Sequence, residues 1–464
     1  MSGINVYAHY AHEEDYPDLD YDSACRRLAA ALSCKTVDRG EKTDDAPFER
    51  LHALVRASYP HVMEASSFEE VGRNLLITCP GTDPSLPCVL LLAHQDVVPV
   101  VPGTERDWQH DAFAGDIDET FVWGRGALDI KDMLMGELEA LEYLLTHGKR
   151  PRRTVVLAFG ADEETASAGA TRLAALLEER GVRAAWLLDE GTTTMIDGAI
   201  WGAQGRVLAD VCISQKGYLD VRLDAHGEGG HSSNPFGGTS LERLCRAIAR
   251  IADSRPAPKL TPIVCDSFRA LAPHIAEEPL STLVKDVDGN AEKIAALAAT
   301  RRELFPFVAT TMAVDMLQGG SAAPNVMPGD VSATINFRLL PGTTADNVLA
   351  WVREALRGTG VTATPVHYTP AGRMDSTVGA GYAEVAEALG HYYRDVDVVP
   401  SFVCGGTDAI RYEAVCGSIL RVSPFRPTPE EEATGVHGVN ERISRRTYAQ
   451  GIRVLVRLLE RTVL

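Results

Sequence analysis

The sequence lacks the features that mark secreted, membrane-bound and nucleic-acid-binding proteins. Its first residues, MSGINVYAHYAHEEDYPDLD, have neither the basic start nor the apolar stretch of a secretory signal. No uninterrupted apolar run is long enough to span a bilayer. No basic cluster offsets the formal net charge of −19, so phosphate backbones would repel the chain. We therefore expect a cytoplasmic protein that binds neither nucleic acid nor membranes.

Cysteine pairing motifs and repeats are also absent. The nine cysteines are scattered from Cys25 to Cys416, form no Cys-x-x-Cys pair and are odd in number. Free thiols in a reducing compartment are the simplest explanation. The chain is 45% hydrophobic and 23% charged, which is ordinary for a soluble enzyme. Its 464 residues are too many for one ordinary core and predict two or three domains.

Apolar runs alternate with helical patterns over the first two hundred residues. The runs 89–93, 155–160 and 184–188 have the length and composition of buried strands. Residues 131–148 and 169–181 place apolar side chains at helical spacing and end at a glycine. This alternation predicts an α/β fold in which a mostly parallel sheet is flanked by helices.

The pattern changes near residue 214. Residues 218–227 and 333–342 alternate apolar and polar side chains, as strands with one solvated face do. Helical stretches lie between them. Helical spacing of apolar residues resumes at about residue 376, and a last helix is expected at about 444–459. We therefore expect one discontinuous α/β domain, residues 1–213 and 375–464, with an α+β domain of residues 214–374 inserted in it.

Residues with metal-binding side chains follow several of these apolar runs and a glycine-rich loop. They are His94 and Asp96, Asp129 in GRGALDIKD, Glu163 and Glu164, Asp189 and Glu190, and His437 in HGVNER. Imidazole and carboxylate groups are ligands for zinc, manganese or cobalt. Each cluster alone is more often a surface pair, a solvated acid or a turn. Three of them, however, end strands of one predicted sheet, and ligands collect at the carboxyl ends of such strands.

A pair of metal ions would account for the number of these residues. Two metals about 3.5–4 Å apart need one carboxylate that bridges them and terminal ligands on each. A further carboxylate, bound to neither metal, must deprotonate the bridging water and later protonate the leaving amine. Adjacent Glu163 and Glu164 could divide these duties, and either Asp189 or Glu190 could be a ligand.

These motifs, in this order, resemble the aminoacylase and carboxypeptidase family of co-catalytic zinc amidohydrolases. The resemblance covers nearly the whole chain after about residue 70 and is carried by AHQDVVPV, WGRGALDIKD, DEE, DEG, GHSSNP, NVMPG, NFRLLPG, GGTDAIRY and HGVNERIS. The branch that it resembles most contains the vacuolar carboxypeptidase S type and the N-acyl amino acid synthase/hydrolases. The family implies a zinc-exopeptidase-like catalytic domain, an inserted lid or dimerisation domain, and two divalent metal ions. Zn²⁺ is the implied metal, with Co²⁺ or Mn²⁺ as alternatives.

The resemblance assigns roles to the polar clusters residue by residue. It implies that one metal is held by His94, Asp129 and Glu190 and the other by Asp129, Glu164 and His437. Glu163 would be the general acid/base, and Asp96 would orient His94, as metal-bound histidines usually require. The family also implies a cis peptide bond between Asp129 and Ile130.

The implied substrate-binding residues come from the inserted domain and a late loop. His231 of GGHSSNP resembles the histidine that stabilises the oxyanion, and Arg338 of NFRLLPG resembles the residue that clamps the substrate carboxylate. Asn325 and the loop of Gly405, Gly406 and Thr407 would line the same site. From the residues alone, Arg338 could instead form an ion pair at a strand edge, and Gly405 and Gly406 could form a turn.

The implied function is hydrolysis of an amide bond beside a free carboxylate, in an N-acyl amino acid or a short peptide. A dipeptidase of the same family is an alternative, and the inserted domain could join two copies into a homodimer. A catalytically silent relative would have lost a metal ligand or the acid/base residue, and none is lost here. A nucleotide-dependent enzyme would need a strand before the glycine-rich segment VGAGYAEVAEAL near Gly379, and none is predicted there.

Overall fold

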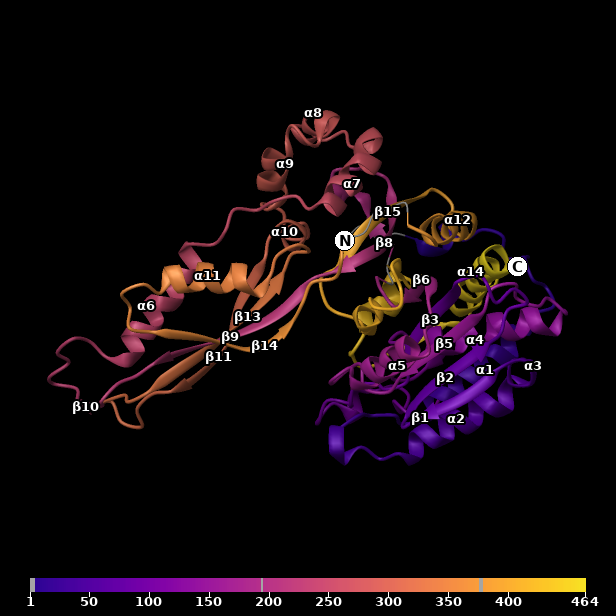
Figure 1. Cartoon of the computed structure of the whole chain (residues 1–464), viewed down its shortest axis with the longest axis horizontal. Coiled ribbons are helices and arrows are strands. Elements are labelled where there is room, and N and C mark those ends of the chain that lie inside the picture. Colours follow the sequence, from indigo (N-terminus) through magenta and orange to yellow (C-terminus); the bar gives the residue numbers. More distant parts are fainter. Residues whose placement is uncertain (1–4, 193–194, 375–378) are drawn as a thin grey trace.

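The computed structural model describes residues 5–192, 195–374 and 379–464 and shows a larger and a smaller body joined by extended strands (Figure 1). Within these residues, the sheet of the larger body has the order β1-β2-β5-β3-β6-β16-β8-β15, with β7 beside β8. The strands are β1 (Ser67–Val71), β2 (Asn74–Cys79), β3 (Cys88–His94), β5 (Val155–Gly160), β6 (Ala184–Asp189), β7 (Ile196–Asp197), β8 (Val207–Gln215), β15 (Val396–Val403) and β16 (Ile419–Arg421).

The predicted α/β class is confirmed. Strands β5, β3, β6 and β16 form a parallel group, and β8 and β15 are parallel to each other. The pairs β1–β2, β2–β5, β7–β8 and β8–β16 are antiparallel. A small ribbon of β4 (Phe121–Trp123) and β17 (Arg442–Ser444) lies beside this sheet.

Helices cover both faces of the larger sheet. They are α1 (Tyr21–Leu32), α2 (Ala46–Ser58), α3 (Pro60–Ala65), α4 (Lys131–Thr146), α5 (Ala168–Glu179), α12 (Tyr382–Tyr392), α13 (Pro429–Thr434) and α14 (Arg445–Val463), with short 3₁₀ turns η1 (Val6–His9), η2 (Gly40–Lys42), η3 (Glu105–Asp107), η4 (Gly198–Trp201) and η7 (Asp408–Tyr412). In β3, Leu91 and Ala93 pack with α1, α4 and α14, whereas Leu90 and Leu92 pack with α5. Both faces of the strand are therefore buried, which explains its continuous apolar run.

The smaller body has a separate core. Its antiparallel sheet has the order β11-β13-β9-β14, and α6 and α11 supply the apolar side chains that cover one face. The elements between residues 217 and 369 are β9 (Gly217–Ala225), β10 (Gly230–His231), α6 (Ser240–Asp253), α7 (Pro262–Leu271), η5 (Ala272–His274), α8 (Leu280–Leu283), η6 (Val284–Asp286), α9 (Ala291–Ala298), α10 (Phe305–Val308), β11 (Thr311–Gly319), β12 (Val326–Met327), β13 (Val331–Leu339), α11 (Ala345–Ala355) and β14 (Thr362–Thr369).

The helices α7 to α10 pack against the larger body and not against the smaller core. The ring of Phe268 lies edge-on to that of Trp201 at 5.2 Å, and the hydroxyl of Ser267 donates to the carbonyl oxygen of Pro400 at 2.6 Å. The predicted range 214–374 therefore contains residues of both cores. A helical pattern shows which face of a helix is buried but not which sheet it covers. The predicted boundary at 374/375 adjoins residues 375–378, which lie outside the described residues.

The nine cysteines are free thiols, as expected. In the part of the chain that the structure describes, no helix combines the length and the apolar composition needed to cross a bilayer.

Candidate metal centre

Four side chains converge on the carboxylate of Asp129. Its Oδ1 lies 3.0 Å from Nε2 of His94, and its Oδ2 lies 3.1 Å from Nε2 of His437. Nε2 of His437 is 3.0 Å from Oε1 of Glu164, and Nε2 of His94 is 3.9 Å from Oε1 of Glu190. The atoms thus form two groups of three potential ligands, and Asp129 belongs to both.

These separations fit the ligands of two metal ions. Two atoms bound to one Zn²⁺ at about 2.0–2.1 Å in tetrahedral geometry lie about 3.3–3.4 Å apart. The observed separations, from 3.0 to 3.9 Å, bracket that value. The two oxygens of Asp129 face different histidines, as a bridging carboxylate requires. Two imidazoles and three carboxylates are a donor set that suits a pair of divalent ions such as zinc.

The crowded charges shift the pKa values of the group. Burial alone would lower the pKa of His94, but contacts with Asp129 and Asp96 raise it well above its usual range. Hydrogen bonds with Asp129 and Glu164 raise the pKa of His437 to about 10. Burial and the nearby carboxylates raise the pKa of Glu190 well above its usual range. A buried group of acids is costly unless cations lie beside it, so its electrostatics favour bound metal.

Three of these potential ligands lie at or just after the ends of three neighbouring strands. His94 is the last residue of β3, Glu190 follows β6, and Glu164 lies in the loop after β5. Because these strands are parallel neighbours, their carboxyl ends meet at one edge of the sheet. Asp129 lies just before α4, and the predicted cis peptide bond between Asp129 and Ile130 is present.

Asp96 contacts both the loop after β5 and the ring of His94. Its two carboxylate oxygens accept hydrogen bonds from the backbone N–H groups of Glu163 and Glu164, both at 3.1 Å. Nδ1 of His94 lies 2.9 Å from the carbonyl oxygen of Asp96 and 3.5 Å from its Oδ1. Because Nδ1 donates to this residue, Nε2 of His94 is left to bind a metal.

Glu163 belongs to neither three-ligand group, but its carboxyl interacts electrostatically with His94, Glu164 and Asp129. Burial raises the pKa of its carboxyl well above the usual range, the charge of His94 opposes the rise, and the charge of Asp408 adds to it. Of the two acids that the sequence leaves open, Glu190 lies in the group. Asp189 instead accepts a hydrogen bond from the backbone N–H of Ala409 at 2.8 Å.

A buried ion pair joins the Asp129 loop to the His437 loop. Glu441 accepts hydrogen bonds from Nη1 of Arg125 at 2.5 Å and from the backbone N–H of Leu128 at 2.9 Å. Nη2 of Arg125 donates to the carbonyl oxygen of His437 at 3.1 Å. Sequence reasoning missed this pair. Its signal was a charged residue of opposite sign in each of two ligand-bearing motifs, WGRGALDIKD and HGVNERIS.

Arg338 stands on β13, and its guanidinium lies 4.7 Å from the centre of the Tyr218 ring. Among the described residues, no carboxylate pairs with it, so the strand-edge ion pair considered from the sequence is not formed. Burial raises the pKa of the Cys404 thiol, and the charges of Lys216 and Arg338 oppose that rise. Arg338 lies opposite Tyr218 of β9. Two residues before Tyr218, the backbone N–H of Lys216 donates to the carbonyl oxygen of Val403, the residue before Cys404, at 2.9 Å.

The loop after Cys404 is thus the part of the predicted substrate site that lies near Arg338. It contains Gly405, Gly406 and Thr407. The backbone N–H of Thr407 donates to Oε1 of Gln215 at 3.3 Å, and its hydroxyl accepts a hydrogen bond from Nε of Arg421 at 3.1 Å.

His231 and Asn325 lie elsewhere, at the far end of the smaller body on and beside the β10–β12 ribbon (Figure 1). The backbone N–H of Ser233 donates to Nδ1 of exposed His231 at 3.1 Å. A neutral His231 ring therefore carries its proton on Nε2, where it can be donated. The carbonyl oxygen of Asn325 accepts from the backbone N–H of Ser232 at 3.0 Å.

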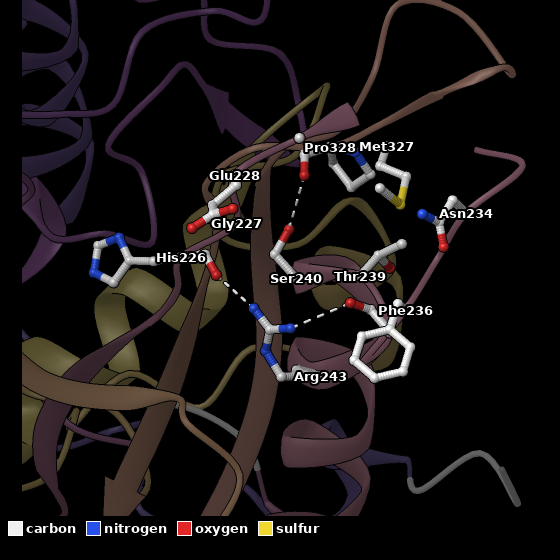
Figure 2. Close-up of a pocket in the computed structure, with 12 residues that line it drawn as sticks. His226, Gly227, Glu228, Asn234, Phe236, Thr239, Ser240, Arg243, Met327 and Pro328 are labelled. Carbon is white, nitrogen blue, oxygen red and sulfur yellow. Dashed lines mark hydrogen bonds between the residues drawn. The ribbon is translucent and has the colours of Figure 1, made fainter. Parts of the chain in front are cut away.

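A cavity of about 640 Å³ lies at the base of this ribbon (Figure 2). Arg243 donates to the carbonyl oxygen of His226 at its wall, and the hydroxyl of Ser240 approaches that of Pro328 at 3.4 Å. Phe236, which also lines the cavity, is 98% exposed. In Figure 1 this end of the smaller body is far from β3 and β6, so the structure does not bring His231 to the Asp129 group.

The chain is similar to known proteins in sequence and in fold. The model of the peptidase family M20/M25/M40 matches residues 90–461. Probable carboxypeptidase S-like 2 of Dictyostelium discoideum is 27% identical over 97% of this chain and 87% of its own length. The N-fatty-acyl-amino acid synthase/hydrolase PM20D1 of Homo sapiens is 30% identical over 93% of this chain and 86% of its own. The M20 family metallo-carboxypeptidase Sso-CP2 from Sulfolobus solfataricus superposes with a TM-score of 0.67 at 19% identity, over 95% of this chain and 99% of that one.

Replacing Glu441 tests whether the buried pair holds the two ligand loops together. Glu441→Ala leaves a buried, unpaired guanidinium, so we expect the free energy of unfolding to fall by about 3–5 kcal/mol. Metal affinity should fall by about 10–100-fold, as for other residues that support ligands. Urea unfolding of the metal-free chain and competition with a chelator measure the two effects.

Glu69→Ala is the matched control, because Glu69 forms a two-pronged pair with Arg180 on the surface. Its loss should change stability by less than about 1 kcal/mol and leave metal affinity unchanged. Equal effects of the two substitutions would show that the buried pair does not position the ligands.

Proposed function

Because the chain belongs to the peptidase family M20/M25/M40, and is therefore a metallohydrolase of amide bonds, we propose that it hydrolyses N-acyl amino acids. The amide bond that it cleaves would lie beside a free carboxylate, and carboxypeptidase action on short peptides would follow the same chemistry. The observation that carries this proposal is the pair of three-ligand groups that share Asp129, with the carboxyl of Glu163 interacting electrostatically with residues of both.

We assign one metal ion to each of the two three-ligand groups. One divalent ion, zinc by preference, would be held by His94, Asp129 and Glu190, and the other by Asp129, Glu164 and His437. When bound, the two ions would polarise the amide carbonyl and lower the pKa of water. Glu163 would take the proton of the attacking water and return it to the leaving nitrogen. Asp96 would hold Glu163 in place through its backbone N–H.

A cavity beside the Asp129 group has a partly apolar wall that could receive an acyl group. This cavity of about 240 Å³ borders Asp129 and Glu190 and is lined in part by Leu128, Met133 and Val436. An acyl chain gains free energy on leaving water for such a wall. Dipeptidase action is the second candidate, because Asp129, Asp132 and Glu190 also border this cavity and could face the ammonium group of a dipeptide.

Arg338 is proposed to bind the free carboxylate of the substrate. Its guanidinium is half-buried, faces the Tyr218 ring and has no carboxylate partner among the described residues. A guanidinium can bind a carboxylate through two parallel hydrogen bonds. The loop of Gly405, Gly406 and Thr407, which follows Cys404, would line the same part of the site.

His231 and Asn325 are proposed to act on the substrate of a second copy of the chain. They lie far from the Asp129 group of their own chain (Figure 1). β11 offers a joining surface, because it is an edge strand whose apolar side chains, Val314, Met316 and Leu317, are exposed. An open edge of this kind pairs readily with another strand. We therefore propose a homodimer through the smaller body, with Nε2 of His231 donating to the developing oxyanion.

Glu163→Gln separates proton transfer from metal binding. The substitution keeps size and removes the base, so we expect bound metal to be retained while kcat falls by at least about 10²-fold. Wild type and variant are both reconstituted with Zn²⁺ and assayed with N-acetyl, N-long-chain-acyl and dipeptide substrates that share one C-terminal residue. The wild type should cleave the two acyl substrates faster than the dipeptide. Loss of metal would mean that the roles of Glu163 and Glu164 are exchanged.

Arg338→Ala should weaken cleavage of acids far more than of the matching C-terminal amides. Loss of a charge-assisted hydrogen bond costs about 1.5–3 kcal/mol, which kcat/KM for the two substrate series measures. Arg222→Ala is the control, since Arg222 belongs to the same sheet but pairs with Asp224 at 2.9 Å. Equal losses on acids and amides would assign Arg338 a structural role.

Mixing two inactive variants tests whether His231 acts across the dimer. His231→Ala should keep its metal and lower kcat by about 10²–10³-fold, the range for one oxyanion donor. Mixed dimers of Glu163→Gln and His231→Ala subunits contain one complete site, so activity should return in part. Each variant incubated alone is the control. Near-normal kcat of His231→Ala would refute the oxyanion role, and no recovery on mixing would refute action in trans.

A further inference from the structure

We propose a further divalent-metal site, separate from the Asp129 group, formed by His12, Asp15 and His391. One potential ligand atom of each residue lies within 4.8 Å of those of the other two. His12 and Asp15 belong to the N-terminal segment, which precedes the residues matched by the family model. His391 lies in the last turn of α12, more than three-quarters of the way along the chain.

The geometry of the three side chains suits a transition-metal ion. Nε2 of His391 lies 3.2 Å from Oδ2 of Asp15, close to the spacing of about 3.3–3.4 Å for two ligands of one tetrahedral zinc ion. The rings of His12 and His391 are stacked, with centres 4.1 Å apart, so one ring must turn before an in-plane lone pair of each can point at one ion. Oε1 of Glu14 is 3.7 Å from Nδ1 of His12 but does not belong to the three-ligand group. Two imidazoles favour Zn²⁺, Ni²⁺ or Co²⁺ over Mg²⁺, which prefers oxygen ligands.

The backbone around the site is held before any metal binds. The N–H of Ala11 donates to the carbonyl oxygen of Tyr392 at 3.0 Å. Nε2 of Gln450, from α14, donates to the carbonyl oxygens of both residues, at 2.8 and 3.0 Å. These bonds fix the neighbours of His12 and His391. Little conformational freedom remains to be lost on binding, which favours affinity.

A local turn brings Asp15 beside His12. The N–H of Asp15 donates to the carbonyl oxygen of His12 at 3.0 Å, and His12 has a left-handed backbone with φ of 52°, which is uncommon for a residue with a side chain. The hydroxyl of Tyr392 also donates to Oδ2 of Asp15, at 3.0 Å, and orients the carboxylate. The side chains of His12, Asp15 and His391 are 46%, 33% and 23% exposed, so an ion can enter from solvent.

An ion at this site would cross-link the N-terminal segment to α12. The unfolded chain holds His12 and His391 far apart, so a metal that needs both binds the folded state and stabilises it. The site would therefore act on stability and on the order of residues 5–20, independently of amide hydrolysis.

The number of zinc ions bound per chain tests the proposal. Metal-stripped wild type, His12→Ala, His391→Ala and His110→Ala are dialysed against the same free Zn²⁺ concentration and analysed by mass spectrometry for zinc. His110→Ala is the matched control, because His110 also pairs with an aspartate, Asp116 at 2.9 Å, but belongs to no three-ligand group among the described residues. We expect wild type and the control to bind one zinc more than the other two variants.

Equal zinc contents in all four proteins would overturn the proposal. Should His391→Ala fail to fold by circular dichroism, Asp15→Asn replaces it, because it removes the carboxylate charge and keeps the shape. Hydrogen exchange locates the ion: Zn²⁺ should slow exchange in residues 5–20 of a His94→Ala/His437→Ala chain, and Mg²⁺ should not. Unchanged exchange with Zn²⁺ in that chain would also contradict the site. Neither readout depends on activity, so the proposed function can fail without affecting this result.

Discussion

The carboxylate of Asp129 has one oxygen toward His94 and the other toward His437, and much of the larger body is arranged to keep it so. Parallel strands β3, β5 and β6 bring His94, Glu164 and Glu190 to one edge of the sheet. Packing so many like charges together is unfavourable unless cations offset them. The fold supplies the energy that holds the acids together through the apolar cores on both faces of that sheet.

The supporting residues share one strategy, in which a buried charged group ties backbone segments that are distant in sequence. Asp96 accepts from the backbone of the Glu163–Glu164 loop, and Glu441 accepts from the backbone beside Asp129 while paired with Arg125. Backbone N–H groups are rigid donors, so each loop is held at the atoms that carry the ligands. The ligand positions therefore depend on these contacts as well as on the strands.

The smaller body divides the predicted substrate residues between its two ends. Arg338 is near the junction with the larger body, opposite Tyr218 at the start of β9, whereas His231 is at the opposite end in the β10–β12 ribbon. A rigid sheet between these ends keeps them apart, because its strands β9 and β13 are paired along their whole length. Within one chain, the predicted oxyanion residue His231 therefore does not meet the candidate metal centre.

The sequence by itself determined which side chains are candidate ligands and predicted the elements that carry several of them. The strands that precede His94, ADEE and DEG were predictable from their short, continuous apolar runs, and the ordered motifs identify the family. The helix beginning at Lys131 was likewise predictable from its apolar spacing and the glycine at its end. Local signals of this kind need no knowledge of the rest of the chain.

Only the tertiary structure decided which residues meet. It separated Glu190 from Asp189, paired Arg125 with Glu441, assigned α7 to α10 to the core of the larger body, and brought His12 beside His391. No local pattern records such contacts, because the paired residues are separated by up to several hundred positions and interact only once the sheet and helices have packed. The adjacent acids Asp189 and Glu190 have different partners for the same reason. Successive side chains point in different directions, and only the surrounding fold shows which direction leads to the candidate metal centre.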